Sequence, residues 1–146
     1  MPVVNVQLVF PMIALVFLTI IVLVVTFRRR VAAVKTGKIP ITHFKTYTEG
    51  EPPADIVQAA RHYANLFEAP VLFYVACLVG MVLPVQGIAF VVLAWLFVIV
   101  RAIHAVIHMG QNKLFYRMRA FFTGIVILAI MWIMILVKAI QISSIA

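Results

Sequence analysis

The sequence predicts an all-α integral membrane protein, in which four transmembrane helices form a single bundle over residues 1–146. Composition is the first observation behind this fold class. Of the 146 residues, 66% are hydrophobic and only 11% are charged, whereas soluble domains average about 45–50% apolar and about 25% charged residues. The second observation is a set of four long apolar stretches, each near the ~20 residues that cross a hydrocarbon core. An ordinary soluble globule and a disordered chain are both excluded.

The four spans are expected at residues 8–27, 56–83, 88–109 and 117–142. The first is an uncharged run that ends at three consecutive arginines. A polar connection with turn-forming Gly and Pro residues follows it. The second span is expected as one helix with Asp55 as its N-cap. A tight turn over 84–87 then leads into the third span, and a short polar loop over 110–116 separates the third span from the fourth.

The distribution of basic residues predicts the orientation of the chain in the membrane. Six Lys or Arg residues fall in 28–55 and three in 109–119, whereas 84–87 and the first seven residues have none. Basic residues collect in cytoplasmic loops, so both termini are expected on the non-cytoplasmic side. The net charge of +8 therefore reflects topology, and nucleic-acid binding is not expected because the basic residues flank spans.

Seven polar side chains within or at the ends of the spans form the candidate site. Ionisable groups are costly inside membrane helices, and those that occur there usually have a functional role. On the second span they are spaced i, i+4, i+7, and on the third i, i+3, i+7, so each set shares one helix face. The predicted topology brings all seven to one depth in the cytoplasmic half of the bundle. They are Arg61, Asn65, Glu68, Arg101, His104, His108 and Arg117.

Three arginines against one glutamate predict a net positive pocket, which suits an anionic ligand with carboxylates that guanidinium groups can hold bidentately. The competing interpretation is that these groups form interhelical hydrogen bonds or interfacial anchors. For Arg117, which borders water, that interpretation carries more weight than a site role. For Asn65 and Glu68, which lie two and three turns inside the expected helix, a site role carries more weight. His104 and His108 could chelate a metal, but no Cys or further carboxylate is near them in sequence, so no metal site is expected.

Two motifs carry a resemblance to a known family. One is an R-x-x-x-N-x-x-E pattern that begins at Arg61, with Pro70 just beyond it, and the other is an R-x-x-H pattern that begins at Arg101 and is followed by Arg117. With four spans in about 150 residues, the chain resembles the MAPEG family, the membrane-associated proteins in eicosanoid and glutathione metabolism, over essentially its whole length. Within that family it resembles the bacterial members.

The resemblance implies a homotrimer that binds glutathione as co-substrate between neighbouring subunits at the cytoplasmic end. Arg61, Asn65 and Glu68 match the family's second-span glutathione contacts, and Arg117 matches the arginine that stabilises the thiolate. The remaining expected contacts line or brace the site from the third span: Arg101, His104 and His108. His108 stands where many members of the family have tyrosine, and Phe121 replaces a tyrosine found in some members.

The resemblance therefore implies a glutathione-dependent membrane transferase or peroxidase that acts on a lipophilic electrophile or hydroperoxide arriving from the lipid. The protein is expected to be an integral protein of a bacterial inner membrane, in contact with membrane lipids. The alternative is a non-catalytic membrane protein of the same fold that binds a lipid or a protein partner. The sequence does not separate these two classes.

Overall fold

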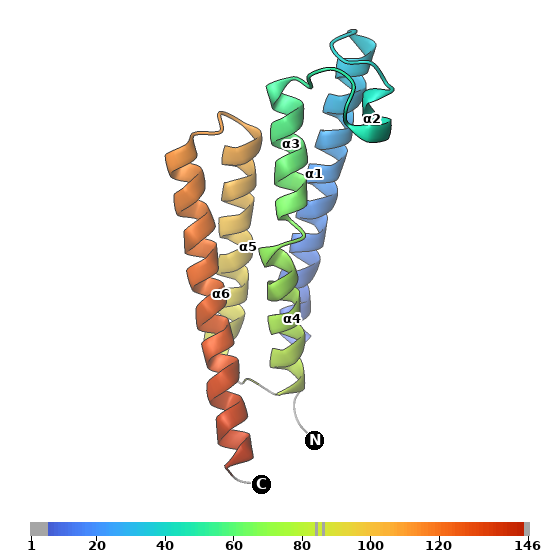
Figure 1. Ribbon diagram of the computed structural model, residues 1–146. Coiled ribbons are helices and arrows are strands. Elements are labelled where there is room, and N and C mark those ends of the chain that lie inside the picture. Colours follow the sequence, from blue (N-terminus) through green and yellow to red (C-terminus); the bar gives the residue numbers. More distant parts are fainter. Residues whose placement is uncertain (1–5, 84, 86, 145–146) are drawn as a thin grey trace.

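The computed structural model describes residues 6–83, 85 and 87–144, and within them the chain forms a bundle of long helices with no strand (Figure 1). Four helical stretches of the described chain are long and apolar enough to cross a membrane: Val6–Lys35, Ala54–Val82, Ile88–Met109 and Leu114–Ser143. The predicted all-α fold class with four spans is therefore confirmed. The predicted tight turn over 84–87 lies partly outside the described residues, which omit positions 84 and 86.

Helix α1 (Val9–Lys35) follows a single 3₁₀ turn, η1 (Val6–Leu8), and continues two turns past the expected end at residue 27. The three arginines do not end it, because arginine is a good helix former. The helix stops at Gly37, which has a left-handed φ of 68°. The amide of Gly37 donates to the carbonyl oxygen of Val34 at 3.0 Å, and the amide of Lys38 donates to the carbonyl oxygen of Ala33 at 2.9 Å. These two bonds form the Schellman pattern of helix termination.

The second span is broken, so the prediction of one continuous helix over 56–83 is wrong. Helix α3 (Ala54–Asn65) and helix α4 (Ala69–Val82) are separated at residues 66–68. Pro70 explains the break, because proline has no amide hydrogen to donate to the carbonyl of Leu66 and its ring clashes with that group. Asp55 is also not the N-cap: Pro53 holds that position and Asp55 lies in the first turn of α3.

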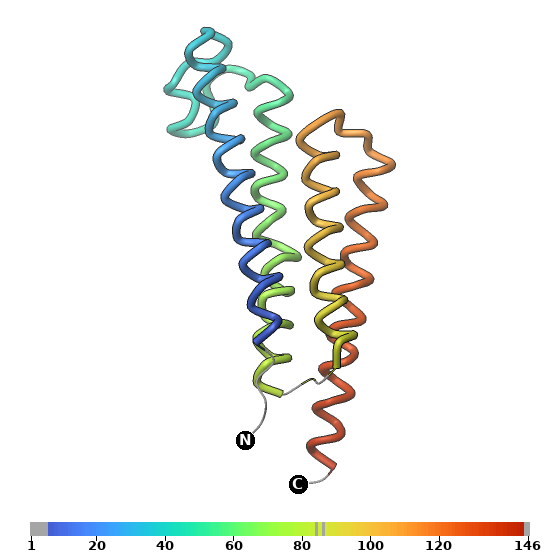
Figure 2. The backbone as a smooth tube through the Cα atoms, turned by 180° about the vertical axis from the view of Figure 1, so that it is seen from behind, coloured from blue at the N-terminus to red at the C-terminus, as the bar shows by residue number. Residues whose placement is uncertain are grey.

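Helix α5 (Ile88–Met109) has the predicted bounds, and helix α6 (Leu114–Ser143) begins three residues before the expected start. Between α1 and α3, the polar connection contains only a four-residue helix, α2 (His43–Thr46). On one side of the bundle lie α1 and α3, and on the other lie α5 and α6; the two pairs diverge toward the end that carries α2 (Figure 2).

The main hydrophobic core fills the opposite end of the bundle, where α4 packs against α5 and α6. The rings of Phe73 and Phe97 stack there with their centroids 4.6 Å apart, and Phe90 and Met131 are fully buried. Apolar side chains on the outer faces of the helices remain exposed. A bundle inserted in a bilayer covers such faces with lipid or with neighbouring subunits.

The close approach of α4 to α5 at Gly80 allows a stability prediction. A Cβ atom added at Gly80 would lie 2.7 Å from Cε1 of the buried Phe90 ring, whereas one added at Gly124 on α6 would meet nothing closer than 3.7 Å. Overpacking of this kind costs about 1–3 kcal/mol, so we expect Gly80→Ala to lower the free energy of unfolding in detergent. Gly124→Ala is the matched control and should leave it unchanged or raise it, because alanine favours helix. Equal effects of the two changes would contradict the prediction.

Candidate functional site

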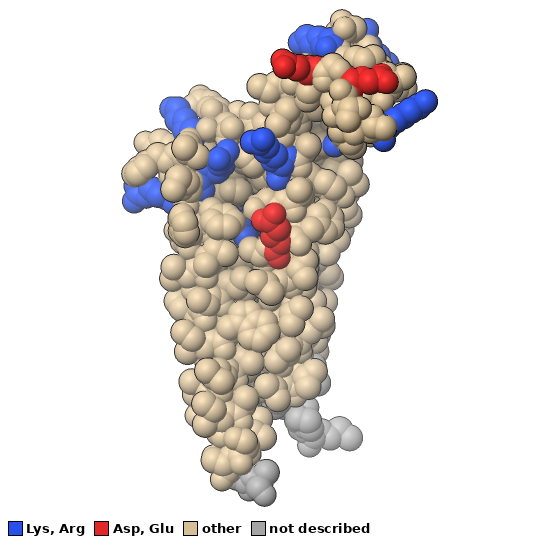
Figure 3. All heavy atoms as spheres, viewed as in Figure 1, with Lys and Arg blue, Asp and Glu red and all other residues tan. Residues whose placement is uncertain are grey.

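Charged side chains gather at one end of the bundle on the face shown in Figure 3, around α2 and the ends of α3, α5 and α6 nearest to it. The described chain begins and ends at the opposite end (Figure 1). Most of the polar residues predicted to share one depth lie at this end of the bundle, where the two helix pairs diverge.

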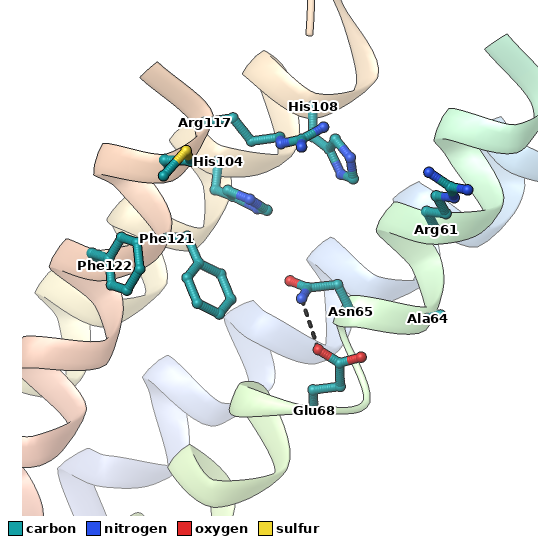
Figure 4. Close-up of a pocket in the computed structure, with 10 residues that line it drawn as sticks. Arg61, Ala64, Asn65, Glu68, His104, His108, Arg117, Phe121 and Phe122 are labelled. Carbon is teal, nitrogen blue, oxygen red and sulfur yellow. Dashed lines mark hydrogen bonds between the residues drawn. The ribbon is translucent and has the colours of Figure 1, made fainter. Parts of the chain in front are cut away.

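A pocket of about 450 Å³ lies here, between α3 and the break on one side and α5 and α6 on the other (Figure 4). Pockets of 300–1,000 Å³ are typical of small-molecule sites. Six of the seven predicted site residues line it, and Arg101 does not. The residues that line the pocket are Arg61, Ala64, Asn65, Glu68, His104, His108, Arg117, Met118, Phe121 and Phe122.

The helix break shapes one wall of the pocket. Asn65 is the last residue of α3, and Glu68 lies in the break with φ −102° and ψ −100°, outside any helix. The two side chains nevertheless meet, because Asn65 Nδ2 donates to Glu68 Oε2 at 2.9 Å (Figure 4). The carboxylate keeps a second oxygen available, and Glu68 is exposed in the single chain, so it can still accept hydrogen bonds from a cationic group of a ligand.

Arg101 supports this wall from behind. Its side chain is only 1% exposed, and its Nη1 donates to Asn65 Oδ1 at 3.2 Å. The guanidinium lies over the rings of Phe97 and Phe121, with its central carbon 5.3 and 5.2 Å from their centroids. Arg101 therefore orients Asn65, and through it Glu68, from a position between two aromatic rings of α5 and α6.

Arg117 is oriented by a residue that sequence reasoning missed. Its Nη1 donates to Asn112 Oδ1 at 2.6 Å, and Asn112 lies in the α5–α6 loop with a left-handed φ of 50°. Asparagine is among the few residues that adopt this conformation readily. The bond directs Arg117 toward His108 and the pocket (Figure 4).

A second cavity of about 350 Å³ adjoins the first and shares Arg61, His108 and Arg117 with it. Its other walls come from the start of α3 and from Asn112. The two cavities together run from the helix break toward the charged end of the bundle, so a polar ligand can extend along both.

Two hydrogen-bonding side chains hold the end of α5 that carries His108. Arg29 of α1 donates through Nη2 to the Met109 carbonyl oxygen at 2.7 Å, and Gln58 of α3 donates to the carbonyl oxygen of His108. These bonds satisfy carbonyl groups that a helix C-terminus leaves without partners. Arg29 thus connects α1 to the site, in addition to the topological role that the sequence suggested for it.

His62 of α3 is a further residue that the sequence did not single out. It is fully buried, and its ring contacts those of His104 and His108. A pattern on α3 alone could not reveal it, because both partners lie on α5. Among the residues that the structure describes, no group of three or more His, Cys, Asp or Glu side chains is arranged to hold a metal ion.

The fold and the pocket define the class of the protein: a helical integral membrane protein with a basic, partly polar pocket at one end of its bundle. Comparison with known families matches residues 8–137 to the MAPEG family. This match covers most of the chain, so the protein belongs to the MAPEG family, and the resemblance seen in the sequence is confirmed. Comparisons with curated proteins and with solved structures gave no match.

Proposed function

We propose that this protein is a glutathione-dependent membrane transferase or peroxidase. One observation carries the proposal: in a MAPEG chain, two arginines and an Asn65–Glu68 pair surround a single pocket. Glutathione carries two carboxylates and one ammonium group at neutral pH. Arg61 and Arg117 are suited to the carboxylates and the thiolate, and Glu68 is suited to the ammonium group.

The chemistry follows from the position of Arg117. A free thiol has a pKa of about 8.5, and an adjacent guanidinium lowers the pKa by stabilising the thiolate. Each pKa unit corresponds to about 1.36 kcal/mol of such stabilisation. The resulting thiolate is the nucleophile that attacks an electrophilic carbon or a hydroperoxide oxygen, and in the second case another glutathione reduces the sulfenic product to the disulfide.

The α6 side of the pocket favours a lipophilic second substrate. Met118, Phe121 and Phe122 line the pocket there, and Phe122 is 58% exposed on the outer surface of the single chain. An apolar molecule dissolved in the bilayer can approach from this side, whereas the polar ligand is held from the opposite side by Arg61 and Glu68.

We also propose that the active form is a homotrimer and that the charged end faces the cytoplasm. Arg61, Glu68 and Phe122 are all exposed in the single chain although they line the pocket, and a neighbouring subunit would enclose them. The basic residues of the connections lie at the same end as the site, which is the cytoplasmic end under the positive-inside rule.

Calorimetric titration of the purified protein with glutathione, in detergent and in lipid bilayers, tests the proposed function. We expect binding with a dissociation constant within the ~1 μM–1 mM range typical of enzyme substrates. Arg61→Ala should weaken it, because Arg61 lines both cavities, and Arg28→Ala, at an exposed position of α1 outside the pocket lining, should not. Absence of glutathione binding in both environments would overturn the proposal and favour a non-catalytic role.

A further inference from the structure

Three successive backbone carbonyl groups at the end of α5 accept hydrogen bonds from side chains of the opposite helix pair. They belong to His108, Met109 and Gly110, where α5 ends and the loop to α6 begins. Gln58 of α3 donates through Nε2 to the carbonyl oxygens of His108 and Gly110, the second at 3.2 Å. Arg29 of α1 donates through Nη2 to the carbonyl oxygen of Met109 at 2.7 Å. We call Gln58 and Arg29 the α5 clasp.

The α5 clasp binds groups that the helix itself cannot pair. The last carbonyl groups of a helix have no amide partner one turn further along. They carry partial negative charge, which a guanidinium at the helix C-terminus stabilises. A glutamine side chain has two amide hydrogens, so Gln58 can hold two carbonyl groups at once. Arg29 also donates through Nη1 to the carbonyl oxygen of Asp55 at 3.3 Å, and the clasp therefore joins α1, α3 and the end of α5.

The bonds of Gln58 cross a cavity. Gln58 and Arg61 line the cavity of about 350 Å³ on the α3 side, and His108, Asn112 and Arg117 line it on the other side. The helix pairs diverge toward this end of the bundle (Figure 2). Because side chains do not fill the space between the two walls, hydrogen bonds have a large share in fixing the position of the α5 end relative to α3.

The end of α5 is continuous with the residue that orients Arg117. Asn112 lies two residues beyond Gly110, and its amide donates to the carbonyl oxygen of Ile107 at 2.9 Å. The side-chain oxygen of Asn112 accepts from Arg117 Nη1 at 2.6 Å. A displacement of the α5 end therefore moves Asn112 and changes the direction of the Arg117 guanidinium.

We propose that Gln58 and Arg29 are positioning residues for Arg117 in the formation of the thiolate. This inference rests on the proposed function. Neither residue lines the main pocket; the α5 clasp holds the end of α5, and Asn112 then directs the guanidinium toward the pocket (Figure 4). Groups that stabilise a developing anion act best when they are held in place before the reaction, and a misplacement of about 1 Å can cost about 10²-fold in rate.

Gln58→Met tests the proposal, because methionine is similar in length and has no amide hydrogen to donate. The full-length variant is saturated with glutathione, and the thiolate is followed by its ultraviolet absorbance across a pH titration. We expect the midpoint to rise by about 0.5–1 pH unit, or about threefold to tenfold, which is the usual effect of losing one or two neutral hydrogen bonds. The affinity for S-methylglutathione, which has no thiol proton, should change by a smaller factor.

Two comparisons separate positioning from a general loss of structure. Gln111→Met is the matched control, because Gln111 is an exposed glutamine of the α5–α6 loop that lines neither cavity. It should titrate as the native protein does. The second comparison introduces Gln58→Met into Asn112→Ala. If the α5 clasp acts through Asn112, the shift caused by Gln58→Met should be much smaller in this background, whereas independent effects would add.

Amide hydrogen exchange without glutathione gives a measurement that does not depend on the proposed function. We expect residues 110–116 to exchange faster in Gln58→Met than in the native protein, because local opening of the loop becomes easier. Exchange in α4 should stay unchanged.

The outcomes separate this inference from the function on which it rests. If glutathione binds but Gln58→Met titrates as the native protein does, or its shift adds fully to that of Asn112→Ala, the positioning role is overturned and the proposed function stands. If glutathione does not bind the native protein, the proposed function fails, and unchanged exchange over 110–116 would also overturn the holding of the loop by the α5 clasp. If Gln58→Met does not fold, Arg29→Met takes its place in the same comparisons.

Discussion

Arg117→Ala should abolish detectable thiolate formation by glutathione at neutral pH and lower turnover by about 10²–10³-fold, the effect of removing one donor that stabilises a developing anion. Arg117 lines both cavities and is held toward the pocket by Asn112. Its removal leaves the thiol with its ordinary pKa of about 8.5, so that most of it is protonated. The thiolate is measured by its ultraviolet absorbance, and turnover by conjugation of a model electrophile.

Two further variants sharpen this prediction. Arg119→Ala removes a cation two residues away whose guanidinium lies over the Phe115 ring and not in the pocket lining, so thiolate formation should persist. Asn112→Ala keeps Arg117 but removes its orienting hydrogen bond, and we expect an intermediate loss. Unchanged thiolate absorbance in Arg117→Ala would show that another group stabilises the anion.

Arg101→Met should separate ligand binding from stability. The guanidinium is buried between two aromatic rings and donates to Asn65. Replacement of a buried charge by an apolar side chain of similar length is often neutral or stabilising. The loss of a charge-assisted hydrogen bond, worth about 1.5–3 kcal/mol, should however leave Asn65 and Glu68 without their positioning contact. We therefore expect the affinity for glutathione to fall at least about tenfold, which corresponds to 1.4 kcal/mol.

The measurements are the denaturation midpoint in detergent and the dissociation constant from calorimetry. Arg101→Lys is the matched variant that keeps the charge, and it should bind more weakly than the native protein, since lysine lacks the planar group that stacks between rings. If Arg101→Met binds glutathione as the native protein does, Arg101 is a packing residue and not a support of the site.

Much of the fold was predictable because hydrophobic runs of membrane length are a strong signal. The bounds of α5 were predicted because Gly87 and Gly110 bracket an apolar run. The break before Pro70 could not be predicted from hydropathy, because one long helix and two consecutive helices have the same apolar pattern. The end of α1 was misplaced because three arginines suggested a connection, although arginine continues a helix readily.

The site was predictable in composition but not in arrangement. Spacing along the second and third spans identified five residues that line the pocket, and the predicted topology added Arg117. The burial of Arg101 between Phe97 and Phe121 could not be predicted, because it depends on how α6 rotates against α5. Asn112 and His62 were missed because their partners lie on other elements. The roles of all these residues in glutathione chemistry stay predictions for the experiments above.

The break between α3 and α4 separates the packing of the two halves of the second span. In a continuous helix, successive side chains are related by a rotation of about 100°, because the helix has 3.6 residues per turn. If one end of such a helix rotates to pack differently, the side chains at its other end rotate with it. Here α3 packs on α1 and α5, whereas α4 packs mainly on α6, and the non-helical residues 66–68 separate the two registers. A substitution that shifts the packing of α4 therefore need not rotate Arg61 and Asn65 of α3 away from the pocket.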